Sequence, residues 1–419
     1  MAVSATDARL ELRRNQRDTA RGAAVPPRRA GIALCLSGGG YRAAIFHCGA
    51  MLRLHQAGIL PDVGFFSAVS GGSIAQAWLA TRYLSQRGPG QSFAQWCAGT
   101  DFLDAVITPF RQVVAADIRT GPVLATLLHN WKWPQHRMRM LERRYARHFG
   151  DTTLAQLPDD PSFVFCATDL TFGVNWEFGR QRVGDYLAGY LRDPGGIPLA
   201  RAVAASSSFP PVFGPMRLAL SADDFKRRGY RGEDGDDLRR RIDLTDGGVY
   251  DNLATEPVLR NAAVVLISDA GAPFAFSTER GYRRLLRYTQ VVGNQAESLR
   301  KRMFFLLRSQ QVLDGTYWGL ASRRRKAGAG YPGALVADVI GRMRTDLDRF
   351  RRIEFDVLLN HGYFSCHNAL QAWPGAPASA KAPGEWPCPD AADEADVRRQ
   401  LESSHRRIFH ARWFGGRRG

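Results

Sequence analysis

Short apolar runs alternate with helix-like patterns in the first part of the chain. Residues 31–36 form an apolar run that ends in a glycine turn, which predicts a buried strand. Over residues 41–57 the apolar positions recur at helical spacing, and Gly58 suits the position just after a helix. Residues 64–69 predict a second strand, and the helical pattern that follows ends by Gly88. This succession of strand, helix, strand and helix predicts an α/β protein with a parallel sheet.

The same patterns continue through the middle of the chain and fade toward its end. Further strands are expected at residues 162–167, 242–244 and 263–268, and helices within residues 93–149 and 281–308. Residues 373–396 are rich in proline, alanine and glycine, which is typical of a linker or a surface loop.

These patterns divide the chain into three parts. We expect a polar, basic tail over residues 1–30, one α/β unit over residues 31–372, and a linker with a basic tail over residues 373–419. Within the α/β unit, the motifs with candidate chemistry lie in residues 31–270, and residues 280–372 form a helical region.

The charge of the chain narrows its expected partners. Lys and Arg number 57 against 40 Asp and Glu, which gives a formal net charge of +17. This excess favours anionic partners such as phospholipid surfaces or nucleic acid, although an arginine-rich composition alone produces the same excess. The sequence holds no recognised motif for reading nucleic acid, so we expect no specific nucleic-acid partner.

Several classes of protein are excluded by what the sequence lacks. No run of about eighteen or more apolar residues predicts a transmembrane helix, and residues 1–30 lack the apolar core of a secretory signal peptide. We therefore expect a cytoplasmic or peripheral membrane protein. The six cysteines include no C-x-x-C pair and the nine histidines no H-E-x-x-H motif, so neither a metal nor a cofactor is expected.

A serine stands at the expected junction between the second strand and its helix. In Ala68-Val69-Ser70-Gly71-Gly72, small residues lie two positions before and after Ser70, close to the G-x-S-x-G pattern of a nucleophile elbow. Ala68 stands in place of the first glycine. Such a turn projects a serine hydroxyl from the carboxyl edge of the sheet, beside helix amides that stabilise negative charge. The same residues also fit an ordinary turn in which Ser70 is the N-cap of the helix.

Three consecutive glycines, Gly38, Gly39 and Gly40, join the first strand to its helix. A turn of this kind lets successive backbone amides converge on one anion. The sequence lacks the lysine of a phosphate loop, and Ala43 stands where the dinucleotide motif has its last glycine. With a candidate nucleophile one strand later, an oxyanion hole explains the turn better than a phosphate site does. A plain tight turn is the alternative.

An aspartate ends a third junction of this type. Asp246 closes a predicted strand and is followed by Gly247 and Gly248. An aspartate at the carboxyl end of a strand can reach the same crevice as Ser70, or it can simply cap the turn. Asp251 lies shortly afterwards, and a turn role fits it better than the role of a base.

Four blocks in this order resemble the patatin-like phospholipase family, which is distantly similar to the cytosolic phospholipases A2. The resemblance spans roughly residues 31–270, with weaker likeness at residues 360–363. The ordered set is specific, although each block is loose alone. The blocks are Ser37-Gly38-Gly39-Gly40-Tyr41-Arg42, Ser70-Gly71-Gly72-Ser73, Ala205-Ser206-Ser207-Ser208-Phe209-Pro210-Pro211-Val212-Phe213 and Asp246-Gly247-Gly248.

This resemblance implies a three-layer α/β/α sandwich with a largely parallel central sheet and helical additions. It also implies a Ser-Asp dyad that needs neither histidine nor metal, with Ser70 as nucleophile and Asp246 as general base. The Gly38, Gly39 and Gly40 amides would form the oxyanion hole, and residues 206–211 a wall of the acyl pocket. The residues that would support the site are Arg42, in the place of the family's arginine near that loop, Gly71, Gly72, Gly247 and Gly248.

The expected function is therefore that of a serine lipid acyl hydrolase, which cleaves phospholipids or other acyl lipids at an anionic membrane surface. A soluble esterase or thioesterase with a Ser-His-Asp triad is an alternative, for which His361 and His367 follow Asp246. A catalytically silent, basic lipid-binding protein is another. Residues 280–308 form a basic amphipathic pattern, which fits either a membrane-surface helix or a core helix with a solvated face. The sequence predicts no oligomeric state.

Overall fold

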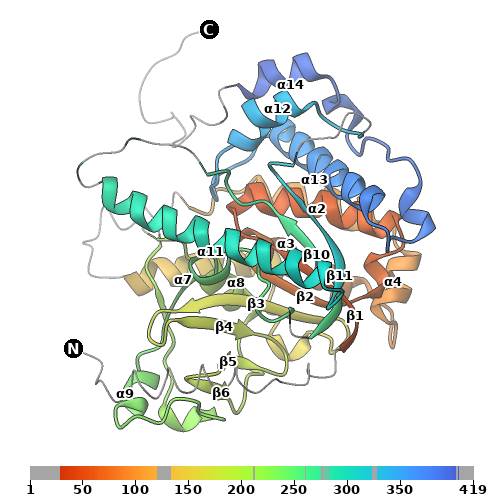
Figure 1. Cartoon of the computed structure of the whole chain (residues 1–419). Coiled ribbons are helices and arrows are strands. Elements are labelled where there is room, and N and C mark those ends of the chain that lie inside the picture. Colours follow the sequence, from red (N-terminus) through yellow and green to blue (C-terminus); the bar gives the residue numbers. More distant parts are fainter. Residues whose placement is uncertain are drawn as a thin grey trace.

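The computed structural model describes residues 29–119, 134–210, 213–259, 261–274, 278, 281, 283–322, 328–402 and 404. These residues form a twisted sheet with helices on both faces (Figure 1). The strands are β1 (Arg29–Leu36), β2 (Val63–Val69), β3 (Ser162–Asp169), β4 (Val174–Phe178), β5 (Val183–Asp185), β6 (Gly189–Leu191), β7 (Met216–Arg217), β8 (Phe225–Lys226), β9 (Asp243–Asp246), β10 (Ala262–Asp269) and β11 (Asp314–Gly319). The α-helices are α2 (Gly40–Gln56), α3 (Gly71–Gln86), α4 (Phe93–Gly99), α5 (Thr108–Val114), α7 (Pro134–Phe149), α8 (Leu199–Ser206), α9 (Gly235–Arg239), α10 (Gly248–Asp251), α11 (Arg283–Ser309), α12 (Gly333–Asp338), α13 (Arg352–Ala372) and α14 (Glu394–Leu401).

Five strands of the sheet run parallel, in the order β11-β10-β1-β2-β3. The predicted apolar runs form these inner strands because a strand that is covered on both faces must be apolar on both. Beyond β3 the sheet continues antiparallel through β4, β5, β6 and β8. The expected α/β class and largely parallel sheet are confirmed, whereas the apolar pattern predicts neither β11 nor the antiparallel extension.

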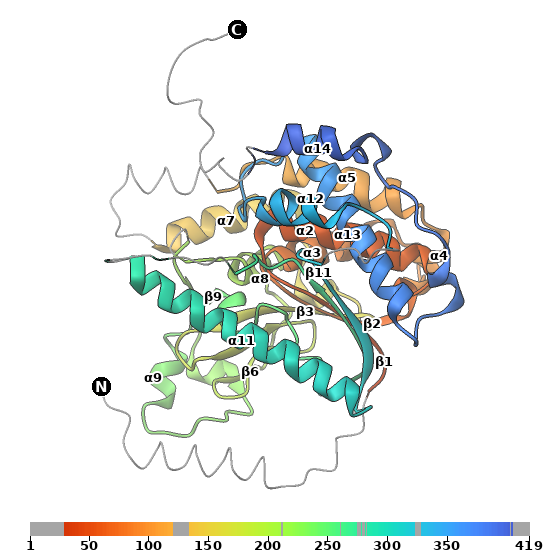
Figure 2. The ribbon, with the colours of Figure 1, turned by 45° about the horizontal axis from the view of Figure 1, so that its top comes forward.

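Alternate residues of β1 enter two different cores. Leu34 and Leu36 belong to a large core shared with α2, α3 and α13, whereas Ala33 and Cys35 belong to a smaller core that includes Phe304 of α11. Figure 2 shows the sheet between these layers, with α2 and α13 on one side and α11 on the other. The three layers are therefore confirmed, and α11 is the outer helix of its layer.

Most predicted elements of the α/β unit form where the sequence places them. The first predicted helix is α2, and Gly58 after it has a φ of 68°, as a residue that ends a helix often does. The helical pattern at residues 281–308 is one long helix, α11. No helix in the described part of the chain is long and apolar enough to cross a bilayer. The tail over residues 1–28 and the end of the chain after residue 404 lie outside the described residues.

The segment after α13, which the sequence predicts as a linker or a surface loop, packs against the α/β unit. Trp373, Ala380, Cys388 and Ala391 are all buried. Asn360 of α13 anchors the segment, because its side chain accepts from the Cys388 amide at 2.9 Å and donates to the Cys388 carbonyl at 2.8 Å. Residues 373–402 thus belong to the α/β unit. Single apolar residues at irregular spacing make these contacts and leave no period in the sequence, so the apolar pattern does not reveal them.

Two carboxyl groups are buried together at the ends of β3 and β5. The Asp169 and Asp185 carboxyl groups lie close enough to share a proton, and each also accepts backbone amides from the turn that follows it. Burial, followed by the charge of Asp169, raises the pKa of Asp185 to about 8 from a usual 3.8. The folded protein therefore keeps a proton on this pair that the unfolded chain releases above pH 4. The contribution of this shared proton to the free energy of unfolding is full below pH 4 and is lost as the pH rises to about 8.

Replacing Asp185 with asparagine is therefore expected to stabilise the fold at alkaline pH. The amide can donate to Asp169 at any pH, so the free energy of unfolding at pH 8 should rise by on the order of 1–3 kcal/mol. At pH 4 we expect little gain. Urea unfolding at pH 4 and pH 8 measures both values, and an equal loss of stability at the two pH values would contradict the shared proton.

Candidate active site

Ser70 lies where β2 ends and α3 begins. Its φ of 50° and ψ of −119° form a left-handed conformation that costs a non-glycine residue about 1–3 kcal/mol. Strain of this kind at a sharp strand-to-helix turn is the geometry of a nucleophile elbow. The Ser70 hydroxyl makes no capping bond to α3, so it does not act as the N-cap that the sequence also allowed. The residue is 8% exposed, which leaves the hydroxyl in limited contact with solvent.

Two glycines allow this turn to close against neighbouring backbone. A Cβ atom at Gly71 would overlap the carbonyl oxygen of Gly40, and one at Gly72 would overlap that of Leu36. The N-terminus of α3 therefore contacts the N-terminus of α2. Both helix dipoles place partial positive charge at this point, where an anion is stabilised.

The glycine turn lies beside Ser70, and its three backbone amides differ in their hydrogen bonding. The Gly38 amide donates to the carbonyl of Asn252 at 3.1 Å, so it is already engaged. The amides of Gly39 and Gly40, like that of Gly71, have no hydrogen-bond partner among the described residues. Gly38 contributes close packing instead, because a Cβ atom there would lie 3.2 Å from the Ser70 Cβ. Of the three expected oxyanion donors, Gly38 is thus engaged elsewhere, and the amides open to an anion at this point are those of Gly39, Gly40 and Gly71.

Strand register brings Asp246 to the end of β2. Val69, the last residue of β2, pairs with Cys166, and the next residue of β3, Ala167, pairs with Asp246. Because β4 occupies the other edge of β3 over the same residues, β9 continues the line of β2 from the opposite direction. Asp246 therefore meets the point where the chain turns at Ser70.

Asp246 is a buried carboxylate whose two oxygens differ in their hydrogen bonding. It is 2% exposed, and its Oδ1 accepts the Gly248 amide at 2.8 Å. Oδ2 has no well-formed hydrogen bond within the described part of the chain. Burial raises the pKa of Asp246 to about 6, and hydrogen bonding from the Ser70 hydroxyl and the Gly248 amide opposes the rise. A loose contact between an acid–base pair is common before substrate binds.

One short segment holds the two turns together. The Ser206 carbonyl accepts the amides of Ser70 at 3.1 Å and Gly247 at 3.3 Å. The Ser206 hydroxyl also accepts the Ser70 amide, at 3.0 Å, and the Ser208 carbonyl accepts the Asp246 amide at 3.2 Å. The family resemblance implies that this block is a wall of the acyl pocket, and its described contacts also hold the Ser70 and Asp246 turns in register. Pro211, at the end of the expected wall, lies outside the described residues.

Arg42 braces the glycine turn from inside the protein. Its guanidinium donates to the carbonyls of Met343 at 2.8 Å and Ala270 at 2.9 Å. The residue is 2% exposed, and burial lowers its pKa to about 10. Arg42 therefore fixes two loops against the start of α2.

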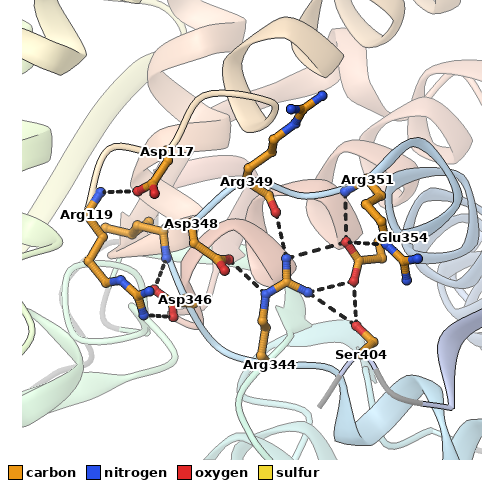
Figure 3. Close-up of polar contacts among 10 residues, drawn as sticks. Asp117, Arg119, Arg344, Asp346, Asp348, Arg349, Arg351, Glu354 and Ser404 are labelled. Atoms are coloured by element: carbon orange, nitrogen blue, oxygen red, sulfur yellow. Dashed lines mark hydrogen bonds and ion pairs between the residues drawn. The ribbon is translucent and has the colours of Figure 1, made fainter. Parts of the chain in front are cut away.

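A network of ion pairs that the sequence analysis missed supports the same turn. Asp346 accepts the Tyr41 amide at 2.9 Å through its carbonyl, and a Cβ atom at Gly40 would lie 2.6 Å from that oxygen. Figure 3 shows how side chains hold this loop: Arg119 pairs with Asp346, while Arg344 pairs with Asp348 at 2.8 Å and with Glu354 at 2.6 Å. The alternation of charges in Arg344-Thr-Asp-Leu-Asp348 is the only signal in the sequence, and it does not identify the partners.

The histidines considered for a triad lie elsewhere. His361 bonds to the Leu320 carbonyl at 2.7 Å, and His367 accepts from Arg53 at 3.1 Å, with no contact to Ser70 or Asp246 among the described residues. Burial lowers the pKa of His361 to about 4. Asp251 has the turn role expected of it, since it accepts amides that follow in the chain. Within the described ranges no three His, Cys, Asp or Glu side chains gather as a metal site would require.

Comparison with known proteins places the chain in a family. No protein of curated function matches the sequence. Among solved structures, this chain is similar to human GIVD cytosolic phospholipase A2, with 15% identity and a TM-score of 0.39. The match covers 57% of this chain and 42% of the phospholipase chain. VipD from Legionella pneumophila is 13% identical with a TM-score of 0.36, covering 83% of this chain and 67% of its own. This chain thus spans less than two thirds of the length of that human phospholipase. The family model for patatin-like phospholipases matches residues 34–259, more than half of the chain, which therefore belongs to the patatin-like phospholipase family.

Proposed function

We propose that this protein is a serine lipid acyl hydrolase that cleaves ester bonds of membrane phospholipids, with Ser70 as nucleophile and Asp246 as general base. The observation that carries this proposal is the meeting of a strained serine, a buried carboxylate of raised pKa and two helix N-termini at one sheet edge. Membership of the patatin-like phospholipase family supports the substrate class.

In the proposed reaction the Asp246 carboxylate takes the Ser70 proton as the serine oxygen attacks the ester carbonyl carbon. Proton transfer by a positioned base contributes about 10²–10⁴-fold to the rate. The oxyanion then forms next to the free amides of Gly39, Gly40 and Gly71, which is the arrangement that stabilises a tetrahedral intermediate. When the intermediate collapses, Asp246 returns the proton to the departing alcohol oxygen and the acyl group stays on Ser70.

Hydrolysis of the acyl-enzyme repeats the same steps with water. Asp246 accepts a proton from the water as it attacks the acyl carbon, and the proton goes back to the Ser70 oxygen when the fatty acid leaves. One carboxylate therefore serves both halves of the reaction. A pKa near 6 suits this double role, because the group is mostly ionised at pH 7 and is still basic enough to hold the proton briefly.

The dependence of kcat/KM on pH is expected to reflect the raised pKa of Asp246. The group must be ionised to act, so kcat/KM should rise about tenfold per pH unit below pH 6 and level off above about pH 7. Steady-state rates on a neutral ester between pH 4.5 and 8 measure the profile. A profile that is already level at pH 5 would show that the base is not a buried carboxylate of this kind.

Product analysis tests the proposed function as a whole. Vesicles of 1-palmitoyl-2-oleoyl-phosphatidylcholine with 30% of the matching phosphatidylglycerol serve as substrate, and mass spectrometry identifies the released fatty acid and lysophospholipid. We expect the wild type to release both, and the Ser70→Ala variant to release neither. Turnover of short soluble esters alone would favour the soluble esterase, and no turnover of either substrate would favour the silent lipid-binding protein.

A further inference from the structure

Helix α11 carries an apolar stripe on the side that faces away from the protein. The stripe consists of Tyr288, Val292, Leu299, Met303 and Leu306. Successive members are four, seven, four and three residues apart, which places them on one face of the helix. Each is between 43% and 69% exposed. This helix holds seven of the twelve large apolar side chains that are exposed among the described residues, so the exposure is concentrated there.

The opposite side of α11 turns charged groups toward the protein. Glu297, the one acidic residue in this helix sequence, pairs with Lys301 at 2.6 Å, and Arg300 pairs with Asp251 at 3.1 Å. A surface helix ordinarily has its apolar side inward and its charged side in water. In α11, Glu297 and Arg300 form ion pairs on the side that faces the protein, whereas the apolar stripe is exposed to solvent. The stripe therefore does not serve the core of this chain.

We propose that the outer stripe of α11 docks the protein on an anionic lipid bilayer. Arg284 and Arg302 are exposed on the same side of the helix as the stripe, and no acidic side chain lies there. Apolar side chains that enter the bilayer boundary beside arginines that meet lipid phosphates are the features of an interfacial helix. A second copy of this chain fits less well, because a twofold contact would bring the same basic residues together without acidic partners.

The inner side of α11 connects this surface to the candidate active site. Asn252 donates to Glu297 at 3.1 Å, and its carbonyl accepts the Gly38 amide of the glycine turn. Helix α10, which begins two residues after Asp246, packs against α11, with Arg300 5.0 Å from the ring centre of Tyr250. A bilayer held by the outer side of α11 would thus be separated from the turns that carry Ser70 and Asp246 by about the 10 Å width of this helix. The inference rests on the proposed function for its biological purpose, but docking itself does not require catalysis.

Vesicle sedimentation separates docking from hydrolysis when every protein carries the Ser70→Ala substitution. The probes are phosphatidylcholine vesicles with and without 30% phosphatidylglycerol, and the test variant is Val292→Asp with Leu299→Asp. Leu170→Asp, at an apolar residue 51% exposed in the turn between β3 and β4, is the matched control. Thermal unfolding midpoints confirm that the three proteins fold alike, as expected for exposed positions.

We expect the parent and the control to bind the anionic vesicles more tightly than the neutral ones, and the double variant to bind at least about tenfold more weakly. Equal binding by the double variant, or no binding by the parent, would overturn the proposal. Sedimentation velocity without vesicles tests the alternative that the stripe binds a second copy of this chain. A parent dimer that becomes a monomer in the double variant would assign the stripe to a second copy of the chain.

Discussion

Replacing Ser70 with alanine is expected to lower kcat for phospholipid hydrolysis by about ten-thousand-fold or more, because no acyl-enzyme can form without the hydroxyl. The substitution removes one oxygen from a residue whose backbone is fixed by the Ser206 carbonyl and hydroxyl. Binding of lipid vesicles should be unchanged. Release of fatty acid, followed with excess enzyme over several hours, measures the loss.

Ser67→Ala is the matched control for this prediction. Ser67 is also buried in β2, three residues earlier, and its hydroxyl contacts the thiol of Cys166 at 3.7 Å. We expect the control to keep kcat within a few-fold of the wild type. Similar losses in both variants would mean that disturbance of the strand, and not loss of a nucleophile, explains the effect.

Replacing Asp246 with asparagine is expected to lower kcat by about a thousand-fold with little change in KM. The amide has nearly the shape of the carboxylate, and its oxygen can still accept the Gly248 amide, so the turn should keep its structure. It cannot accept the Ser70 proton, which removes general-base catalysis worth about 10²–10⁴-fold. Steady-state rates with a soluble ester give kcat and KM separately, and an unchanged unfolding midpoint verifies the fold.

His361→Ala distinguishes the dyad from a triad. His361 is buried and bonded to the Leu320 carbonyl, so its removal should lower the free energy of unfolding by on the order of 1–3 kcal/mol. Turnover per folded molecule should stay within a few-fold of the wild type. If His361→Ala stopped turnover while Asp246→Asn did not, the assignment of the base would be wrong.

The sequence predicts those parts of the site that are local in the chain. A glycine turn or an elbow is made by consecutive residues, so the positions of Gly39, Gly40 and Ser70 at strand-to-helix junctions can be read from the apolar pattern. The strain at Ser70 and the overlap that a side chain at Gly71 would cause explain why these residues stand there. Placing Asp246 beside Ser70 needed the family resemblance, because only strand pairing between β3 and β9 brings them together.

The parts that the sequence did not predict depend on distant partners. In the sequence, the Gly38 amide cannot be told apart from those of its glycine neighbours. Its hydrogen-bond acceptor is the carbonyl of Asn252, which lies more than two hundred residues later in the chain. Arg42 likewise depends on carbonyls of Ala270 and Met343, which no side-chain pattern identifies. The choice between a membrane-surface helix and a core helix with a solvated face at residues 280–308 also depends on contacts that the sequence does not show. Its charges then proved to lie partly against the protein, with its apolar stripe outside.

Labelling with a fluorophosphonate tests the central claim most directly, that Ser70 is a nucleophile activated by Asp246. A fluorophosphonate reacts only with an activated serine, and peptide mapping by mass spectrometry locates the adduct. We expect one adduct on Ser70 in the folded wild type, much slower labelling in Asp246→Asn, and none after unfolding. An adduct on another residue, or no adduct on Ser70 in the folded protein, would contradict the account.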